Sequence, residues 1–285
     1  MKPVEDRSTW AALAWARAAR AHDRAQHEAA LAKEYEFQAA RTDDAMYLQL
    51  AETHRRMEAC HLSSARLQES YARNATRWTA RTGKGPQFMS GVAEACGTSS
   101  ATLALLAADH TQLAFAASDA PSQAAQDLEY MLGEGPCTDA AGQRRPVHLT
   151  GTEIEAHWPG YGPALTALGI GEVAAVPLQP ADDTGQCLGA LAAFDPRPGL
   201  VESGALRAIG AALARTVLLD PDADPTLYGG VDHRDTINQA AGMLAVRASC
   251  PVPHALALIK ARAFADGVSP RQLAEAVISG DLNLV

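Results

Sequence analysis

The chain has 285 residues and a formal net charge of −9 at pH 7. This length is enough for about two domains plus extensions. No apolar run reaches the roughly 18 residues that a membrane-spanning helix needs, and the N-terminus lacks a basic segment followed by an apolar one. We therefore expect a cytoplasmic protein with no membrane partner.

The cysteines are five, an odd number, and they are scattered without a CxxC or a His/Cys pair at metal-ligand spacing. This pattern excludes a disulfide scaffold and a structural zinc site, so we expect no metal. Most of the negative charge lies in the middle of the chain, where residues 86–227 hold five Lys/Arg against seventeen Asp/Glu. Such a segment repels nucleic acid, so any contact with nucleic acid must come from the ends of the chain.

Residues 1–85 are predicted to be helical. From Val4 to Thr82 the chain contains no glycine and no proline and is rich in Ala, Leu, Arg, Glu and Gln, which are good helix formers. Thr42-Asp43-Asp44 can cap a second helix, so a break near Arg41 is expected.

A heptad frame follows this break, although Thr53, Ser64 and Asn74 interrupt it. Its two core positions hold Leu50, Met57, Tyr71 and Trp78, and Met46, Cys60 and Leu67. The apolar core positions favour a coiled coil that joins two copies of the chain. Polar residues in its seam can fix register and partner number at a cost in stability. An intramolecular helical hairpin is the alternative.

Residues 86–219 change from a helical period to short apolar runs. Residues 101–107 and 112–117 flank Asp109-His110-Thr111, and residues 173–178 and 187–194 flank Asp182-Asp183-Thr184-Gly185, which predicts two β-hairpins. Helices are expected over residues 123–131 and 202–219. The predicted fold class is therefore α+β, with helices flanking an antiparallel sheet.

This segment resembles the GAF domains of actinobacterial regulators. The resemblance lies in Leu132-Gly133-Glu134-Gly135-Pro136-Cys137-Thr138-Asp139-Ala140, Arg144-Arg145-Pro146-Val147, Trp158-Pro159, Gly169-Ile170, Val176-Pro177-Leu178 and Leu188-Gly189-Ala190-Leu191. It implies a central antiparallel sheet and a small-molecule pocket between sheet and loops. The first helix of the domain is shortened to Phe88 to Cys96.

The pocket candidates are Glu134, Gly135, Cys137 and Trp158. A glycine-rich loop lets backbone approach a ligand closely, although the same loop can simply turn the chain. The cofactor or ligand is unknown, since the sequence has no GxGxxG and no Walker loop. An enzymatic alternative is a thiol-dependent reductase that uses Cys137, which needs an activated thiolate and a resolving partner.

Residues 220–230 form a linker that contains two prolines and two glycines, and residues 231–285 form three short helices. Asp232 and Asp235 suit the start of the first helix, whose apolar face is Ile237, Ala240, Ala241, Leu244, Ala245 and Ala248. Leu256, Ile259 and Ala263 form the apolar face of the second helix, which Gly267 ends. The third helix begins with Ser269-Pro270-Arg271-Gln272, a capping box, buries Leu273, Val277 and Ile278, and ends at Gly280.

These three helices, roughly from Tyr228 to Leu282, resemble the ANTAR domain, a three-helix RNA-binding module of bacterial transcription antiterminators. The resemblance begins at Ile237-Asn238-Gln239-Ala240-Ala241-Gly242-Met243-Leu244. It implies binding to paired stem-loops in messenger RNA by a protein that an upstream sensor dimerises. The family often has lysine at the position of Ala241.

The charge of this tail is balanced, with five Lys/Arg and five Asp/Glu in residues 228–285. RNA-binding domains are usually basic, so a plain bundle whose glycine and alanines serve close packing is the alternative. The candidate RNA-binding residues are Arg234, Gln239, Ala240, Gly242, Met243, Arg247, Lys260, Arg262 and Arg271. We expect a homodimeric, signal-responsive transcription regulator, or else a dimeric scaffold whose tail binds protein and not RNA.

Overall fold

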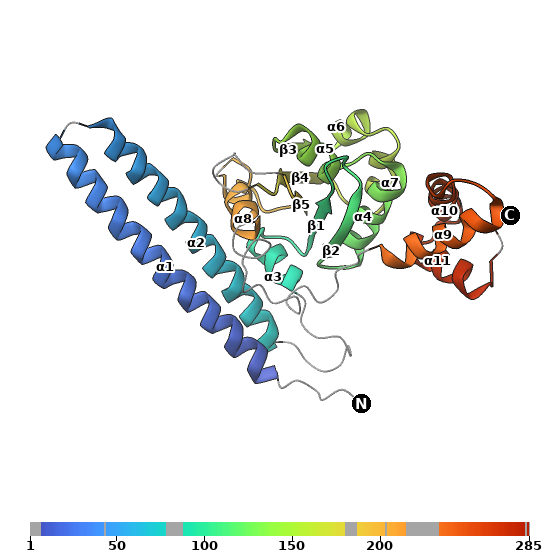
Figure 1. Cartoon of the computed structure of the whole chain (residues 1–285), viewed down its shortest axis with the longest axis horizontal. Helices are drawn as coiled ribbons and strands as arrows, with labels where there is room; N and C mark the ends of the chain where they lie inside the picture. The colour runs from blue at the N-terminus through green and yellow to red at the C-terminus, as the bar shows by residue number, and fades with distance from the viewer. Residues whose placement is uncertain are drawn as a thin grey trace.

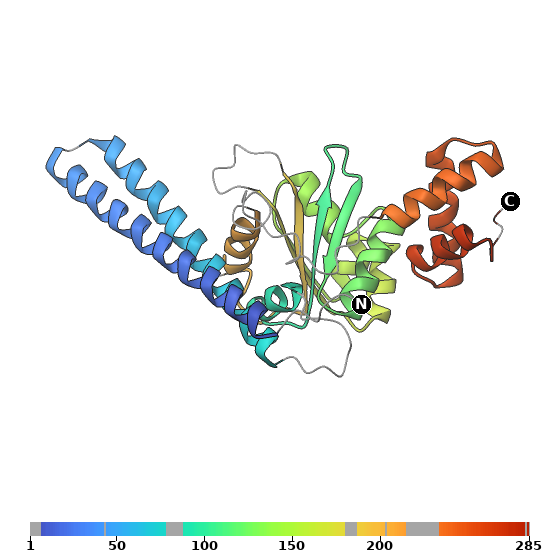
Figure 2. The same ribbon diagram turned by 60° about the horizontal axis from the view of Figure 1, so that its bottom comes forward.

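The computed structural model describes residues 7–42, 44–77, 88–179, 187–202, 204–214, 234–282 and 284. These ranges form a helical hairpin, an antiparallel sheet with helices on both faces, and a bundle of helices at the C-terminal end (Figure 1). The hairpin and the bundle lie on opposite sides of the sheet domain in both ribbon views (Figures 1 and 2). The predicted α+β class is confirmed.

The N-terminal hairpin consists of α1, Arg7–Thr42, and α2, Ala45–Arg77, which pack along each other. The buried stripe of α1 is built from alanines at three-, four- and seven-residue spacing, namely Ala14, Ala18, Ala21, Ala25, Ala32 and Ala39. Residues at these spacings share one helix face, and their small side chains let the two helices approach closely. Asp44 Oδ1 accepts a hydrogen bond from the Met46 amide at 2.8 Å, so the predicted break is confirmed.

The two N-terminal helices form the intramolecular hairpin that was the alternative, and association of two chains stays a prediction. Cys60, Leu67 and Tyr71 from the predicted seam are buried in the core that α2 shares with the sheet domain of the same chain, whereas Met46 is 52% exposed. Within the chain, α1, α3 and α8 pack against α2, so the spacing of these residues does not by itself require a second chain. Trp78 lies outside the described residues.

The sheet has the strand order β2-β1-β5-β4-β3, and all of its neighbouring strands are antiparallel. Its strands are β1 Ser100–Leu106, β2 Gln112–Ala117, β3 Val147–Thr150, β4 Glu172–Pro177 and β5 Gly189–Phe194. Both predicted hairpin pairs are confirmed. The turn between β1 and β2 is closed by the Ala107 amide, which donates to the Thr111 carbonyl at 2.9 Å, whereas the turn between β4 and β5 falls outside the described residues.

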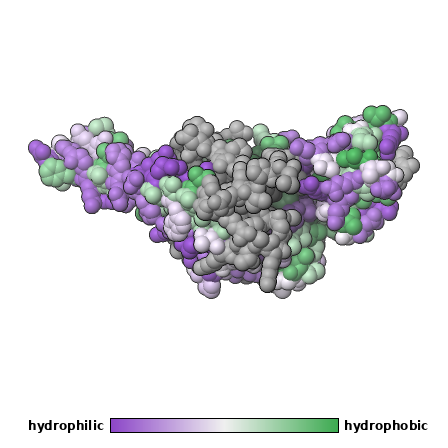
Figure 3. All heavy atoms as spheres, turned by 90° about the horizontal axis from the view of Figure 1, so that it is seen from below, coloured by the Kyte–Doolittle hydropathy of each residue, from purple (hydrophilic) through white to green (hydrophobic). Residues whose placement is uncertain are grey.

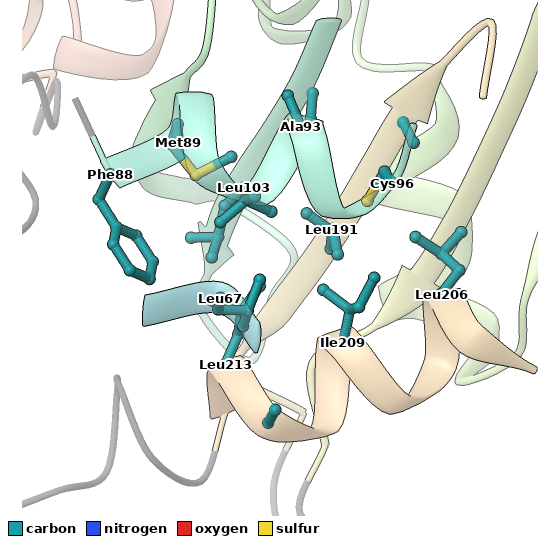
Figure 4. Packing of buried hydrophobic residues seen from close by; sticks show 14 of the residues in the cluster. Leu67, Phe88, Met89, Ala93, Cys96, Leu103, Leu191, Leu206, Ile209 and Leu213 are labelled. Carbon is teal, nitrogen blue, oxygen red and sulfur yellow. The ribbon is translucent and has the colours of Figure 1, made fainter. Parts of the chain in front are cut away.

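Helices cover both faces of the sheet. Alternate residues of its inner strands point to opposite sides, so each strand contributes to two cores. Leu103 and Leu191 face a core with α2, with α3, Phe88–Ala95, and with α8, Ala205–Leu213 (Figure 4). Ala104 and Ala190, their neighbours in sequence, face the other core. The predicted helix over residues 202–219 is described as far as Leu213, and residues 215–219 lie outside the described ranges.

The opposite face of the sheet is covered by four helices: α4 Ala120–Leu132, α5 Pro136–Gln143, α6 Thr152–His157 and α7 Tyr161–Ala167. Phe115, Trp158 and Phe194 are buried in this core. The predicted helix over residues 123–131 is confirmed as α4, which begins earlier because Asp119 accepts a hydrogen bond from the Ser122 amide at 2.9 Å as its N-cap.

The C-terminal bundle consists of α9 Asp235–Ala248, α10 Val252–Asp266 and α11 Pro270–Ser279. The capping box is confirmed, since the Gln272 amide donates to Ser269 Oγ at 3.1 Å and the Ser269 amide donates to Gln272 Oε1 at 3.2 Å. Gly267 and Gly280 end their helices in the left-handed conformation. The N-cap of α9 is Arg234, whose side chain does not cap the helix, whereas Asp235 places the predicted negative charge in the first turn. Asp232 lies outside the described residues.

No single helix in the described part of the chain is long and apolar enough to cross a membrane. Only α9 and α10 taken together have the length and composition, and they meet at a bend of 112°.

Candidate nucleic-acid interface

Arg234 joins the C-terminal bundle to the sheet domain. The residue is 1% exposed, and its backbone is left-handed, with φ of 57°. Its guanidinium Nη1 donates to Asp127 Oδ1 on α4 at 2.7 Å, and Nη2 donates to Gln112 Oε1 on β2 at 2.8 Å. The side chain therefore reaches back from the start of α9 into the sheet domain.

Two aromatic rings complete the surroundings of this guanidinium. Arg234 Cζ lies 4.2 Å from the ring centroid of Phe115 and 4.2 Å from that of Tyr130. A cation against an aromatic face gains electrostatic attraction, and the gain is larger where water is excluded. Arg234 is thus a docking residue, and the prediction that it contacts RNA is wrong for this arrangement because its donors are used inside the protein.

Lys260 lies at the same junction. Its Nζ is 3.9 Å from the centroid of the Tyr130 ring. Tyr130 belongs to α4, against which α10 packs. Burial lowers the pKa of the Lys260 ammonium, and the neighbouring charge of Arg234 lowers it further. The side chain is half-buried, so Lys260 is also turned toward the sheet domain.

Both cations converge on residues that the sequence reasoning missed, namely Gln112, Phe115, Asp127 and Tyr130. Tyr130 belongs to the apolar core of the bundle although it comes from α4. The one local signal for this contact was a face of α4 that carries polar and apolar residues together. Asp127 and Tyr130 lie more than 100 positions before Arg234, and no spacing rule links them.

The exposed face of α9 holds the rest of the first motif. Gln239 and Arg247 are exposed, Gly242 and Met243 are half-buried, and Val246 is 81% exposed. Figure 3 shows apolar residues exposed among polar ones on this bundle. Arg247 has no hydrogen-bond or ion-pair partner among the described residues, so its charge is available to a ligand.

Gly242 is not required by the packing of the bundle. A Cβ placed on this residue would meet no atom of the described residues within 4 Å beyond its own helix turn, and its backbone φ is not positive. Glycine in a helix interior costs about 1 kcal/mol relative to alanine. The alternative in which this glycine serves close packing within the bundle is therefore wrong.

The neighbouring alanines serve the core. Ala240 and Ala241 are both fully buried, against Ile259 and Val277 among others. Ala240 therefore cannot present its side chain to RNA. The position at which the family often has lysine faces the inside of this bundle, so Ala241 leaves no gap on the exposed face.

Two further basic candidates are exposed but paired. Arg262 Nε lies 2.6 Å from Asp266 Oδ2, and Arg271 Nε lies 3.0 Å from Glu275 Oε1, each one helical turn away. Such exposed pairs contribute only a few tenths of a kcal/mol. Both guanidiniums can therefore exchange their partner for a phosphate at little cost.

The four pocket candidates of the sheet domain do come together. Glu134 Oε1 accepts hydrogen bonds from the amides of Gly160 and Tyr161 at 2.6 and 2.7 Å, which fixes the start of α7. Gly135 has φ of 155°, and a Cβ there would lie 2.7 Å from the Glu129 side chain. Trp158 is buried and donates from Nε1 to Asp139 Oδ2 at 3.1 Å.

The sequence did not identify the central group of this cluster, Glu129. Its Oε1 accepts a hydrogen bond from the Thr138 amide at 2.6 Å, and burial raises the pKa of this carboxyl to about 7. Tyr161 is buried with its hydroxyl unpaired among the described atoms, and burial, with Glu129 and Cys137 nearby, raises its pKa well above the ordinary value. The Glu129 carboxyl and the Tyr161 hydroxyl are therefore two buried polar groups at the centre of this cluster.

The structure works against the reductase alternative. Cys137 is 1% exposed, and burial followed by the charge of Glu129 raises the pKa of its thiol well above the ordinary value. A nucleophilic thiol needs the opposite, a lowered pKa and access to substrate. Across the described residues, no three His, Cys, Asp or Glu side chains are placed to hold a metal ion.

A sheet with helices on both faces and a helical bundle attached to it define a protein of two structural modules. The family model of the GAF domain matches residues 86–219, and the family model of the ANTAR domain matches residues 227–278. The chain is therefore a GAF and ANTAR domain-containing protein. No curated protein and no solved structure matches the chain in the corresponding comparisons.

Proposed function

We propose that this protein is a cytoplasmic, signal-responsive transcription antiterminator that binds messenger RNA stem-loops through the exposed face of α9. The proposal divides the chain into a helical segment over residues 1–85, a sensor domain over residues 86–219, a linker over residues 220–230 and an RNA-binding domain over residues 231–285. The GAF match supports the assignment of the sensor domain, and the ANTAR match supports that of the RNA-binding domain.

Gly242 carries the RNA-binding part of the proposal. A helix-interior glycine that nothing in the bundle needs leaves a bare backbone surface, and exposed Gln239, Val246 and Arg247 surround it. Glycine permits close approach of a partner, the amide of Gln239 can donate and accept hydrogen bonds, and Arg247 can contact phosphate. Arg262 and Arg271 add exposed charge elsewhere on the bundle.

Helix α4 is the element through which the sensor domain would act on the bundle. One of its buried residues, Glu129, belongs to the cluster with Cys137 and Tyr161, whereas Asp127 and Tyr130 hold Arg234. A small-molecule ligand beside Glu129 would shift α4 and so change how the bundle is held. Homodimerisation would then present two RNA-binding faces to paired stem-loops.

The test is filter binding of the full chain to RNA with paired stem-loops, at several salt concentrations. Gly242→Ala is expected to raise the free energy of unfolding of the bundle by up to about 1 kcal/mol, because alanine is the better helix former. The same substitution should weaken RNA binding at least tenfold. Ala261→Ser, on the exposed side of α10, is the matched control and should leave RNA affinity within twofold.

A second variant examines the charge. Arg247→Gln should weaken binding and reduce the slope of log affinity against log salt by about one ion. Failure of the folded protein to bind any stem-loop RNA at low salt would sink the antiterminator proposal. Recovery of bound RNA from a cell lysate would then identify the target.

A protein-binding scaffold is the second candidate, and exposed apolar side chains on α10 favour it. Val252, Leu258 and Phe264 are 51%, 47% and 47% exposed. A protein partner that covered such side chains would remove apolar surface from water, which favours association. Leu258→Ser combined with Phe264→Ser separates the two functions: unchanged RNA binding supports the antiterminator, whereas a wild-type chain that binds no RNA but captures a protein lost in this variant supports the scaffold.

A further inference from the structure

An arginine-lined cavity lies between α2, α8 and the turn that joins α5 to β3. Its volume is about 480 Å³, within the range of small-molecule sites. Its basic lining residues are Arg56, Arg144, Arg145 and Arg207, and none of the described residues that line it is acidic. It lies on the side of the sheet domain where α2 and α8 pack, away from the cluster around Glu129, which lies under α4, α5 and α7.

The charge of this cavity is exceptional for its domain. Residues 86–227 hold only five Lys/Arg against seventeen Asp/Glu, and Arg144, Arg145 and Arg207 are three of those five. Like charges gathered in one place repel one another, so the arrangement stores unfavourable energy unless an anion is bound. We propose that this cavity is a binding site for a small phosphorylated ligand.

The arginines are available to such a ligand. All four side chains are exposed. Within the described ranges the side chains of Arg56, Arg144 and Arg207 make no hydrogen bond or ion pair, and the Arg145 side chain bonds only to the neutral amide oxygen of Gln143, at 2.6 Å. Guanidinium groups bind phosphate oxygens with pairs of parallel hydrogen bonds. Several of them around one cavity match a ligand that carries two or more negative charges.

Backbone geometry at the turn gives separate support. Arg144 has φ of 51° and ψ of 34°, a left-handed conformation that glycine adopts at much lower cost. Strained residues of this kind concentrate at functional sites. The positive charge of Arg144 at this C-cap also suits the negative end of the helix dipole, so the backbone cost is offset in part while the guanidinium stays at the cavity.

The neighbouring cavity provides a contrast. It shares Ala208 with the first and is lined by Arg66, Arg73 and Arg197, but also by Glu69 and Glu94. Arg73 there lies 3.9 Å from both carboxylates. The second cavity therefore mixes both signs of charge, whereas the charged residues given for the first are all arginines, which favours a compact anionic ligand there.

The apolar part of the lining favours an organic phosphate. Ala59, Ala211, Pro146 and Pro177 contribute carbon surface beside the guanidiniums. Inorganic pyrophosphate and ATP both carry linked phosphate groups, but only ATP has an organic portion that can contact this carbon surface. ATP should therefore bind more tightly than pyrophosphate, and equal affinities would mean that the phosphates alone are recognised.

Isothermal titration calorimetry of the full chain with pyrophosphate and with ATP tests the assignment. Arg56→Gln combined with Arg207→Gln, both on exposed helix faces, should weaken binding on the order of 100-fold, because a hydrogen bond to a charged group contributes about 1.5 to 3 kcal/mol. Arg247→Gln combined with Arg271→Gln removes the same charge from the bundle and should change affinity less than twofold.

Three results would overturn the assignment. One is no binding of either probe at low salt by folded protein, verified by circular dichroism. Another is equal loss of affinity in both double variants, which would indicate a general charge effect. The last is that neither phosphate probe binds, whereas a short RNA does bind and the Arg56 and Arg207 substitutions abolish that RNA binding. RNA binding by α9 is measured separately, so failure here leaves that proposal standing.

Discussion

Arg234 and Asp127 form a buried ion pair that spans the junction between the ANTAR and GAF modules, with Nη1 and Oδ1 2.7 Å apart and side-chain exposures of 1% and 6%. Removal of one member of a buried pair leaves the other charge without compensation, a cost of about 3 to 5 kcal/mol. The bundle is therefore attached to the sheet domain by a contact that a single substitution can break.

Asp127→Asn should release the bundle from the sheet domain. We expect faster amide hydrogen exchange at the start of α9 and along α4, with little change in the far part of the sheet. The matched control is Asp266→Asn, which removes the exposed partner of Arg262 and should cost less than about 0.5 kcal/mol. Equal exchange in the two variants would contradict the docking role of Arg234.

Local signals allowed the sequence to predict the elements. Ser269 and Gln272 lie within one helical turn of each other, and Gly267 ends a helix by its own backbone preference, so each was readable from neighbours. Strands β1 and β5, which are buried on both faces, were equally accessible, because a short apolar run between turns is a local property.

Contacts between distant segments were not accessible in this way. Cys60, Leu67 and Tyr71 fitted a heptad, but apolar spacing does not say which surface covers it, and the sheet domain does so here. Arg234 was assigned to RNA because it is basic, whereas Asp127, Phe115 and Tyr130 decide its role. The candidate site could be predicted where exposure follows from helix position, as for Gln239 and Arg247.

Two helix-interior glycines should respond in opposite ways to alanine. A Cβ on Gly91 of α3 would lie 2.8 Å from the Tyr71 amide nitrogen, a backbone atom of α2 that cannot turn aside. Gly91→Ala should therefore destabilise the sheet domain by about 1 to 3 kcal/mol through overpacking. Chemical denaturation measures this, with Gly242→Ala as the control that has open space; equal destabilisation by both would contradict the argument.

Loss of the α11 capping box should weaken the bundle. Ser269→Ala removes the acceptor for the Gln272 amide, and loss of an N-cap serine costs about 0.5 to 2 kcal/mol. Thermal unfolding followed by circular dichroism measures the change. Ser279→Ala, which removes an exposed hydroxyl at the other end of α11, should have a smaller effect.

Stability should fall as pH rises from about 4.5 to about 7, because burial raises the pKa of Glu129 from its ordinary value of 4.5 to about 7. Below this window both the folded and the unfolded chain bind the proton, and the carboxyl imposes no penalty. Within the window the unfolded chain releases its proton first, which favours unfolding. Above it the loss is complete and amounts to roughly 3 kcal/mol.

Glu129→Gln keeps an oxygen that can accept the hydrogen bond from the Thr138 amide but cannot ionise. The variant should therefore gain stability relative to the wild type as the pH is raised from 5 to 8, because only the wild type develops a buried charge in that range. Urea denaturation at several pH values measures the difference, and Glu275→Gln on the exposed side of α11 is the control. Parallel stability curves for the wild type and Glu129→Gln would show that this carboxyl ionises without cost, and that Glu129 is better solvated than its burial implies.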